Sequence, residues 1–299
     1  MRGLLFIAAG LIRLLSWLPL SLLHALAWPM GRVLYWLPWK KHAVIQTNLG
    51  LCFPELNAAQ RRRLHRAYLV EQLRLVLEAG AVFHWSRERI ARHVEVTGWD
   101  EVLAQADQGL MLVSGHIGNW ELLNIWMSQQ LPLATLYRAP ENAALDRFMT
   151  RPRERFGGRM VPGGGPALRH LLSQLKKRQA VAVAADIQPK RGDGAFVPLF
   201  GQPALTMTLV SGLARRTDCA VFFCHALRRP GGRGWRLQFE RAPDSIREPE
   251  PEAALAAMNQ WLEASIREAP AQYLWLYKRF SRQPDGSKPY RQQPASATD

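Results

Sequence analysis

The feature that most constrains the fold is an alternation of short apolar runs with longer segments of helical periodicity, between residues 109 and 268. Short runs dominated by apolar residues are typical of buried strands. We expect such strands at 109–114, 133–137, 180–185, 220–227 and 235–240. We expect helices between and after them, at 120–130, 142–156, 166–178, 204–216 and 252–268. Strands that alternate with helices predict an α/β fold with a mixed, partly parallel sheet flanked by helices.

The stretch before this alternation is predicted to begin with a long helix. Apolar residues recur near helical spacing from Asn57 to Ala81, as they do on the buried face of a helix. Residues 80–98 have no clear periodicity and are expected to be irregular, whereas 100–107 is expected to be a short helix. We place one large domain at 40–282, because a chain of this length can bury a sizeable core.

The two ends of the chain differ from this central domain. Residues 14–31 contain no Lys, Arg, Asp or Glu, and such a run just reaches the length of a membrane-spanning helix, although Pro19 and Pro29 interrupt it. Tryptophan favours the boundary between lipid and water, and the region carries Trp17, Trp28, Trp36 and Trp39. We therefore predict a membrane anchor at 1–39, which either spans the bilayer or lies in its interface. A buried soluble helix and a cleavable signal peptide are the alternatives.

The C-terminal stretch is dominated by Pro, Gln, Ser and Asp, so residues 283–299 are expected to form a disordered tail.

The three cysteines, Cys52, Cys219 and Cys224, do not form a disulfide framework. We interpret them as reduced packing residues, which favours a cytoplasmic main domain. Their spacing to histidine does not fit zinc, and we expect neither a metal nor a cofactor.

A strongly basic composition indicates an anionic partner. The formal net charge is +15 and the pI is about 10.5. Nucleic acid, anionic lipid and an acidic protein all fit such a charge. No set of aromatic residues interleaves with the basic ones as nucleic-acid binding requires, so we do not expect a nucleic-acid partner. The basic clusters lie along the whole chain, at 61–63, 151–155, 176–178, 215–216 and 278–279.

The most informative motif is the stretch from Ser114 to Glu121, between a predicted strand and a predicted helix. His116 and Glu121 are five residues apart, and in one continuous helix their side chains would point about 140° apart. Gly115 and Gly118 permit a tight turn instead. Asn119 is a good helix N-cap, which places Glu121 in the first helical turn. The sequence therefore predicts a turn that folds His116 back onto Glu121.

Such a pair has a definite chemical use. A carboxylate bonded to one imidazole nitrogen fixes the tautomer, and the other nitrogen can then take a proton from an attacking hydroxyl. The helix N-terminus offers N–H groups to an oxyanion or a phosphate. The chain has no G-x-S-x-G elbow, P-loop, H-E-x-x-H or dinucleotide fingerprint. Direct transfer with His116 as base is therefore favoured over a covalent acyl-enzyme intermediate. The alternative to a functional pair is a buried histidine beside an unrelated Glu121.

Several sequence blocks in a fixed order resemble those of the bacterial lipid A biosynthesis acyltransferases, the lauroyl- and myristoyl-transferring enzymes of the late steps. These enzymes belong to the wider glycerolipid acyltransferase group marked by His-x4-Asp/Glu. The resemblance covers nearly the whole chain, from about Leu34 to Ser287. The blocks are Asn48 to Leu56, Gly115 to Glu121, Tyr137 to Asn142, Phe196 to Gly201, and Pro270 to Trp275 followed by Lys278-Arg279-Phe280.

The resemblance implies an activity and a set of site residues. The donor would be an acyl chain on acyl carrier protein, and the acceptor a hydroxyl of a lipid A precursor. His116 would be the catalytic base and Glu121 its partner. Arg159 would bind a substrate phosphate or acyl carbonyl, and Asp186 would bind substrate or orient Arg159. The family commonly has Asp-Gln here, and the sequence Asp186-Ile187-Gln188 puts the role of the glutamine in doubt.

The same resemblance implies a bacterial inner-membrane protein whose catalytic domain faces the cytoplasm, with an anionic membrane and an acidic carrier as partners. Two alternatives stay open. One is an acyltransferase for another lipid acceptor, such as a lysophospholipid, an ornithine-type lipid or a glycolipid. The other is a non-catalytic basic protein that binds membranes or nucleic acid, which would have no need of the pair His116 and Glu121.

Overall fold

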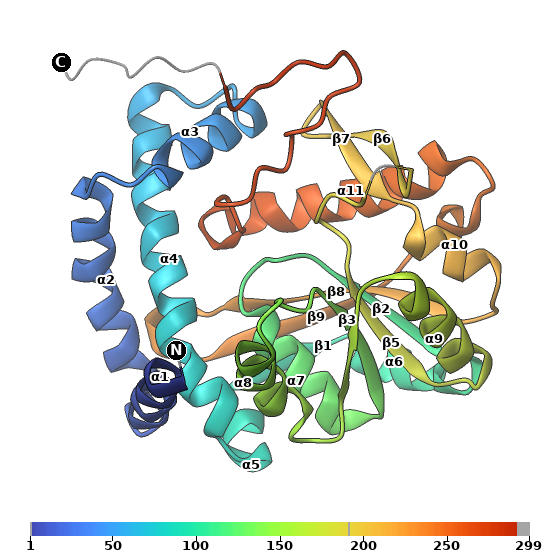
Figure 1. Cartoon of the computed structure of the whole chain (residues 1–299), viewed down its shortest axis with the longest axis horizontal. Helices are drawn as coiled ribbons and strands as arrows, with labels where there is room; N and C mark the ends of the chain where they lie inside the picture. The colour runs from blue at the N-terminus through green and yellow to red at the C-terminus, as the bar shows by residue number, and fades with distance from the viewer. Residues whose placement is uncertain (1, 191, 292–299) are drawn as a thin grey trace.

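The computed structural model describes residues 2–190 and 192–291, and it has an α/β architecture (Figure 1). A seven-stranded sheet runs in the order β1-β9-β8-β2-β5-β3-β4, and a separate hairpin pairs β6 with β7. Strands β8, β2, β5, β3 and β4 are parallel, whereas β9 runs antiparallel to β8 and carries β1 parallel to itself. The strands are β1 Val94–Thr97, β2 Leu110–Ser114, β3 Leu133–Tyr137, β4 Arg159–Pro162, β5 Ala180–Ala184, β6 Gly194–Leu199, β7 Gln202–Met207, β8 Ala220–Arg228 and β9 Trp235–Arg241. The predicted mixed, partly parallel sheet flanked by helices is confirmed.

Helices cover both faces of this sheet. The central strands β2, β5 and β8 are buried along nearly their whole length, as expected for strands covered on both sides. Leu110 and Leu112 of β2 face one core layer, whereas Met111 and Val113 face the other. The helices are α1 Arg2–Leu15, α2 Leu20–Trp36, α3 Lys41–Cys52, α4 Ala58–His84, α5 Arg87–Ala91, α6 Trp99–Ala104, α7 Trp120–Gln130, α8 Ala143–Glu154, α9 Gly165–Lys176, α10 Leu209–Arg215 and α11 Pro251–Glu268.

The first two helices pack against the long helix α4. The backbone breaks between them at residues 16–19, so the apolar run 14–31 is divided between α1 and α2. Gly31 lets α2 lie close to α4, because a Cβ at this position would lie 2.8 Å from the Val70 Cα. Among the helices that the structure describes, none combines the length and the apolar composition needed to cross a bilayer.

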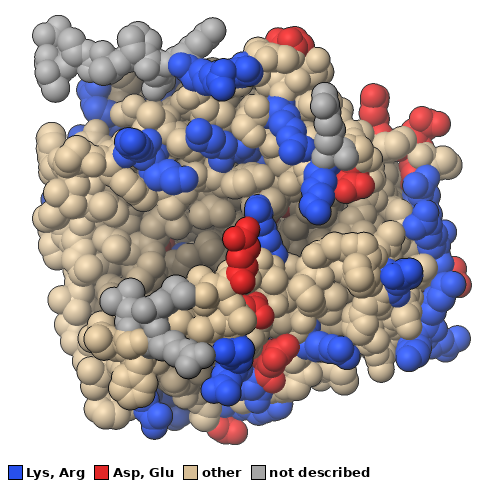
Figure 2. Space-filling model, in the orientation of Figure 1, with Lys and Arg blue, Asp and Glu red and all other residues tan. Residues whose placement is uncertain are grey.

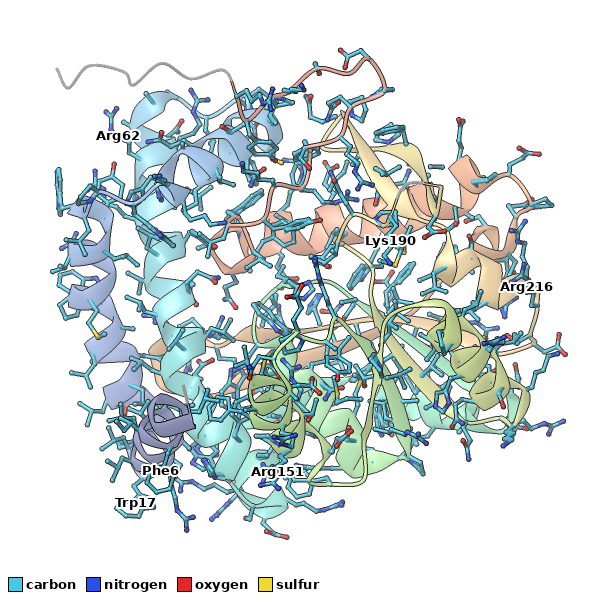
Figure 3. All side chains as sticks on the ribbon, in the orientation of Figure 1. Phe6, Trp17, Arg62, Arg151, Lys190 and Arg216 are labelled. Atoms are coloured by element: carbon cyan, nitrogen blue, oxygen red, sulfur yellow. The ribbon has the colours of Figure 1, made fainter. Side chains whose placement is uncertain are left out.

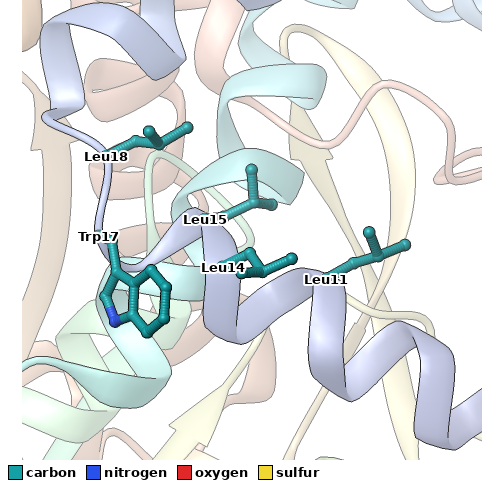
Figure 4. Close-up of a pocket in the computed structure, with 5 residues that line it drawn as sticks. All are labelled: Leu11, Leu14, Leu15, Trp17 and Leu18. Carbon is teal, nitrogen blue, oxygen red and sulfur yellow. The ribbon is translucent and has the colours of Figure 1, made fainter.

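Large apolar side chains stay exposed on α1, α2 and the turn between them. Trp17 is 69% exposed and Phe6 82%, and both lie at the lower edge of the molecule in Figure 3, where Arg151 is also labelled. Figure 4 shows an apolar surface pocket on α1 and this turn, lined by Leu11, Leu14, Leu15, Trp17 and Leu18. The predicted anchor therefore has an apolar outer face, and its attachment to a membrane stays a prediction.

Several elements differ from the expectation. Residues 80–98 are not irregular: α4 extends to His84, and the short helix α5 and strand β1 follow. The edge strand β4 and helix α3 were not predicted. Residues 204–207 belong to the hairpin strand β7 rather than to a helix, because they pair with β6. In the expected tail, Tyr290 accepts a hydrogen bond from the Phe280 amide, whereas residues 292–299 lie outside the described residues.

Candidate active site

The motif histidine lies at the carboxyl edge of the sheet. His116 is the second residue after the end of β2, and Asp186 is the second residue after the end of the neighbouring parallel strand β5. The Ala185 amide donates to the Ser114 carbonyl at 2.8 Å, which continues the pairing of the two strands beyond their ends. Because the ends of adjacent parallel strands meet at one edge, the two side chains come together although they are far apart in sequence.

Asp186 binds His116 through both of its oxygens. The His116 backbone amide donates to Oδ2 at 2.8 Å, and the ring nitrogen Nδ1 lies 2.8 Å from Oδ1. The Asp186 side chain is only 1% exposed, whereas 24% of the His116 side chain is exposed. A carboxylate on Nδ1 favours the tautomer that carries the proton there. The other ring nitrogen, Nε2, then has a lone pair that can accept a proton.

This arrangement corrects the predicted pairing of His116 with Glu121. Asp186 occupies the ring nitrogen expected for Glu121, because β5 lies directly beside β2. Glu121 instead accepts two hydrogen bonds from Arg153, one from Nε to Oε2 at 2.8 Å and one from Nη2 to Oε1. The structure does not support the expectation that Asp186 orients Arg159, because no described hydrogen bond or ion pair joins the two side chains. The negative charge of Glu121 still raises the pKa of His116. Its catalytic role stays a prediction.

Arg153 is the site residue that the sequence did not single out. It lies near the end of α8, and its side chain is 13% exposed. In the sequence it is one of three alternating arginines, with Arg151 and Arg155, and no local signal shows which of them points inward. The Arg155 guanidinium binds the Val82 carbonyl, and Arg151 is exposed. The basic cluster is therefore divided between the site, the interior and the surface.

Arg159 lies elsewhere on the sheet. It is the first residue of β4, is exposed, and pairs in register with Ala134 near the start of β3. His116, in contrast, follows the end of a strand that runs in the same direction. Among the described residues, no hydrogen bond or ion pair connects Arg159 with either His116 or Asp186. Its role in substrate binding stays a prediction.

The charges around His116 change its protonation. Burial alone would lower the pKa of His116, but the negative charge and hydrogen bond of Asp186, and the charge of Glu121, raise the pKa above its ordinary value. Burial alone would raise the pKa of Asp186, but His116 holds the pKa below its ordinary value. Asp186 therefore stays ionised and stabilises a positive charge on the ring.

The turn itself is held from several sides. The Leu274 amide donates to the His116 carbonyl at 3.0 Å, and the Gly118 amide donates to the Gln272 carbonyl at 3.0 Å. Gly118 has φ +63°, and a Cβ there would lie 1.9 Å from the Ala226 carbonyl oxygen, so only glycine fits. Asn119 caps α7 by accepting a hydrogen bond from the Leu122 amide at 2.9 Å, as predicted.

One face of the molecule is hollowed and carries charged side chains. Figure 2 shows a hollow between the part of the molecule that carries α3 and α11 and the part that carries the sheet, with acidic and basic side chains at its centre and basic ones along its upper rim. Arg279 is not part of this basic surface: it is 2% exposed and donates to the Leu205 carbonyl at 2.7 Å. Its predicted cluster partner, Lys278, is exposed.

Comparison with known proteins gives one consistent family. The model described as "Bacterial lipid A biosynthesis acyltransferase" matches residues 1–282. The chain is 29% identical to the lipid A biosynthesis lauroyltransferase of Escherichia coli K12 over 95% of its length and 93% of the relative. It is 28% identical to the lipid A biosynthesis palmitoleoyltransferase of the same organism, over 83% of its length and 81% of the relative. A phosphatidylinositol mannoside acyltransferase of Mycolicibacterium smegmatis is 26% identical over 58% of the chain and 59% of the relative.

We predict that Asp186→Asn lowers the pKa of His116, because the charge that favours the protonated ring is removed while the burial that opposes it remains. The measurement is an NMR titration of the histidine ring signals, with His116 assigned from a His116→Gln variant. His225, whose pKa burial lowers to about 4, is the internal control and should not move. A His116 titration that is unchanged by Asp186→Asn would contradict the described pair.

Proposed function

Since the chain belongs to the bacterial lipid A biosynthesis acyltransferase family, we propose that it transfers a fatty acyl chain from acyl carrier protein to a hydroxyl of a lipid A precursor, with His116 as general base. The observation that carries the proposal is the state of the His116 ring. Its Nδ1 is fixed by the buried Asp186 carboxylate, and the ring is partly exposed. Such a ring is suited to take a proton from a bound hydroxyl.

In the proposed reaction, the acceptor hydroxyl gives its proton to Nε2 of His116 as its oxygen attacks the thioester carbonyl. The new C–O bond forms and the C–S bond to the carrier breaks. The imidazolium then returns the proton to the departing thiolate, so the products are an ester and the carrier thiol. Asp186 stabilises the imidazolium between these two steps, because it stays ionised beside the ring.

We assign Glu121 a role that acts through Arg153. Two parallel hydrogen bonds hold the guanidinium to the Glu121 carboxylate in the first turn of α7. A guanidinium held in this way presents its remaining N–H groups in a fixed direction, where they can bind a phosphate or a developing oxyanion. The Leu122 amide already donates to Asn119, so the helix N-terminus offers fewer free donors than the sequence suggests. Arg153 is accordingly the main positive group for this task.

The charge of the molecule supports an anionic donor and acceptor. Acyl carrier protein is acidic, and a phosphorylated lipid lies at an anionic membrane surface. Arg147 and Arg151 are exposed on α8, the helix that also carries Arg153 into the site. These two arginines are therefore suited to approach an acidic partner without entering the catalytic turn.

We also propose that the protein is bound to the bacterial inner membrane, with the catalytic domain on its cytoplasmic face. The exposed apolar side chains of α1 and α2 would enter the interface between lipid headgroups and acyl chains. Arg32 lies over the ring of Trp28, with its guanidinium carbon 4.1 Å from the ring centroid, at the exposed side of α2. A cation beside an amphipathic ring is typical of this boundary.

A second acceptor class deserves a direct comparison, because the mycobacterial relative is named for acylation of a mannosylated phosphatidylinositol. Both acceptors are phosphorylated glycolipids with free hydroxyls. Parallel reactions with a lipid A precursor and with a phosphatidylinositol mannoside, followed by mass spectrometry of the lipid products, distinguish them. Acylation of the lipid A precursor alone supports the first proposal, and acylation of the mannoside alone contradicts it.

We predict that His116→Ala lowers the rate of acyl transfer by about 10²-fold or more, because the general base is lost. The measurement is the initial rate with an acyl carrier protein donor and a lipid A precursor. His93→Gln is the matched control, since His93 bonds the Arg89 carbonyl 2.7 Å away and lies outside the described site. Near-normal turnover of folded His116→Ala protein would contradict the mechanism.

We predict that the triple variant Leu11→Ser, Leu14→Ser, Trp17→Ser is released from vesicles that contain anionic lipid, even though its net charge is unchanged. Each exposed apolar side chain that enters lipid contributes on the order of 1.5–3 kcal/mol, so binding should fall by at least about 100-fold. The measurement is cosedimentation with vesicles at high salt, which screens the contribution of the basic residues. Leu103→Ser is the control, because Leu103 is 49% exposed on α6. Vesicle binding equal to that of the unaltered protein would contradict interfacial attachment.

A further inference from the structure

A carboxylate in the interior of the molecule joins the catalytic turn to two other parts of the fold. Glu78 lies on α4 and is 0% exposed. It accepts a hydrogen bond from His24 on α2, whose Nε2 is 2.7 Å from Oε1, and from Asn119, whose Nδ2 is 2.7 Å from Oε2. Arg228, at the end of β8, donates from Nε to both oxygens at 2.9 Å. Glu78 is therefore bound by donors from α2, from β8 and from the turn before α7.

These contacts keep Glu78 ionised in the interior. Burial alone would raise the pKa of Glu78, but the charge of Arg228 and the hydrogen bonds of His24 and Asn119 hold it below the ordinary value. A buried ion pair of this kind is weak evidence for a gain in stability, because an apolar replacement of equal volume is often at least as stable. The groups that Glu78 binds therefore indicate its role better than its contribution to stability does.

The contact with Asn119 connects Glu78 to the reacting groups. Asn119 is fully buried, and its amide side chain acts in two directions: Oδ1 caps α7 through the Leu122 amide, and Nδ2 donates to Glu78. The Asn119 backbone amide also donates to the Ala226 carbonyl at 2.8 Å. Asn119 lies between His116 and Glu121 in the turn. A fixed Asn119 side chain therefore holds the position of His116 after β2 and the position of the first turn of α7.

We propose that Glu78 is a positioning residue for acyl transfer, which holds the Asn119 side chain and thereby sets the geometry between His116 and the pair of Glu121 with Arg153. This inference rests on the proposed function. Through His24 the same carboxylate also ties α2, which carries part of the exposed apolar face, to the catalytic turn. Glu78 acts through Asn119 and does not touch substrate, since its side chain is buried.

The test reverses the direction of the hydrogen bond between residues 78 and 119. Glu78→Gln leaves one acceptor oxygen where the carboxylate has two, so an NH2 group faces either the Asn119 donor or the donors on the other side, His24 and Arg228. Asn119→Asp sets two carboxylates against each other. In the double variant, Glu78→Gln with Asn119→Asp, the amide at 78 donates to one carboxylate oxygen at 119 while the other oxygen keeps the cap, so the contact is restored with its polarity reversed. Such a cycle isolates the coupling between the two positions.

Two further variants control for unfolding and for charge. Asn119→Ser keeps an oxygen for the cap, whereas its shorter side chain lacks the Nδ2 group that donates to Glu78. Glu71→Gln alters a second acidic residue of α4, whose Oε2 lies 3.6 Å from Arg228 Nη1 but which has no described bond to Asn119. The full-length variants are compared by melting temperature, by kcat and KM with both substrates, and by hydrogen exchange of the peptide spanning residues 116–126. The exchange measurement needs no substrate.

The positioning role predicts that each single change at 78 or 119 lowers kcat by about 10-fold or more with KM changed by less than about 2-fold. Hydrogen exchange in residues 116–126 should be faster in these variants. The double variant should recover kcat and exchange protection to within about 3-fold of the unaltered protein. Glu71→Gln should leave both unchanged.

Two results would overturn the role of Glu78: a double variant impaired as much as the product of the single losses, or Glu71→Gln with a loss equal to that of Glu78→Gln. If the single variants at 78 do not fold, Asn119→Ser decides, because normal kcat and normal exchange in that variant contradict the proposal. An unaltered protein that transfers no acyl chain would instead refute the proposed function. Hydrogen exchange of residues 116–126 in the same variants would still test whether Glu78 holds the turn.

Discussion

The bond between the Asp186 carboxylate and the His116 ring depends on one relation between neighbours in the sheet. Strand β5 lies directly beside β2 and parallel to it, so the residues that follow the two strands meet at the same edge. Asp186 is buried there and accepts both the backbone amide and the ring nitrogen of His116. An ionised aspartate in this place fixes the tautomer of the ring and raises its affinity for a proton. The proposed chemistry follows from that single contact.

The rest of the fold keeps this contact in place from several directions. The segment around Leu274 binds the backbone of the turn from one side, and β8 approaches Gly118 so closely that a side chain would not fit. From the interior, Glu78 holds Asn119, which starts α7 and so places Glu121 against Arg153. The turn is therefore fixed before substrate arrives, and preorganised charges of this kind need little rearrangement during reaction.

Much of this arrangement could be predicted from local sequence, and the parts that could not have physical reasons. Strands β2, β5 and β8 were predictable, because burial on both faces gives them continuous apolar runs. Edge strand β1 was missed, since its four residues alternate between half-buried and exposed and include Glu95. The turn around His116 and the cap by Asn119 were predictable from glycines and a capping residue at fixed spacing.

The partners within the site, in contrast, could not be read from spacing. Glu121 is close to His116 in sequence, yet the nearer carboxylate in space comes from Asp186, and only the order of strands in the sheet decides this. Arg153 and Arg151 are equivalent in local composition, and the packing of α8 alone determines which one enters the site. Contacts between distant segments therefore determine which side chains meet at the site.

The central claim is that His116, held by Asp186, is the group whose deprotonation permits acyl transfer. The most direct measurement compares the pH dependence of kcat/KM with the NMR titration of the His116 ring in the same protein. We expect kcat/KM to rise with pH as the ring loses its proton, with a common midpoint above the ordinary histidine value of about 6.5, because the pKa of His116 is raised. A rate that stays constant while His116 titrates, or that rises at a midpoint unrelated to it, would contradict the account.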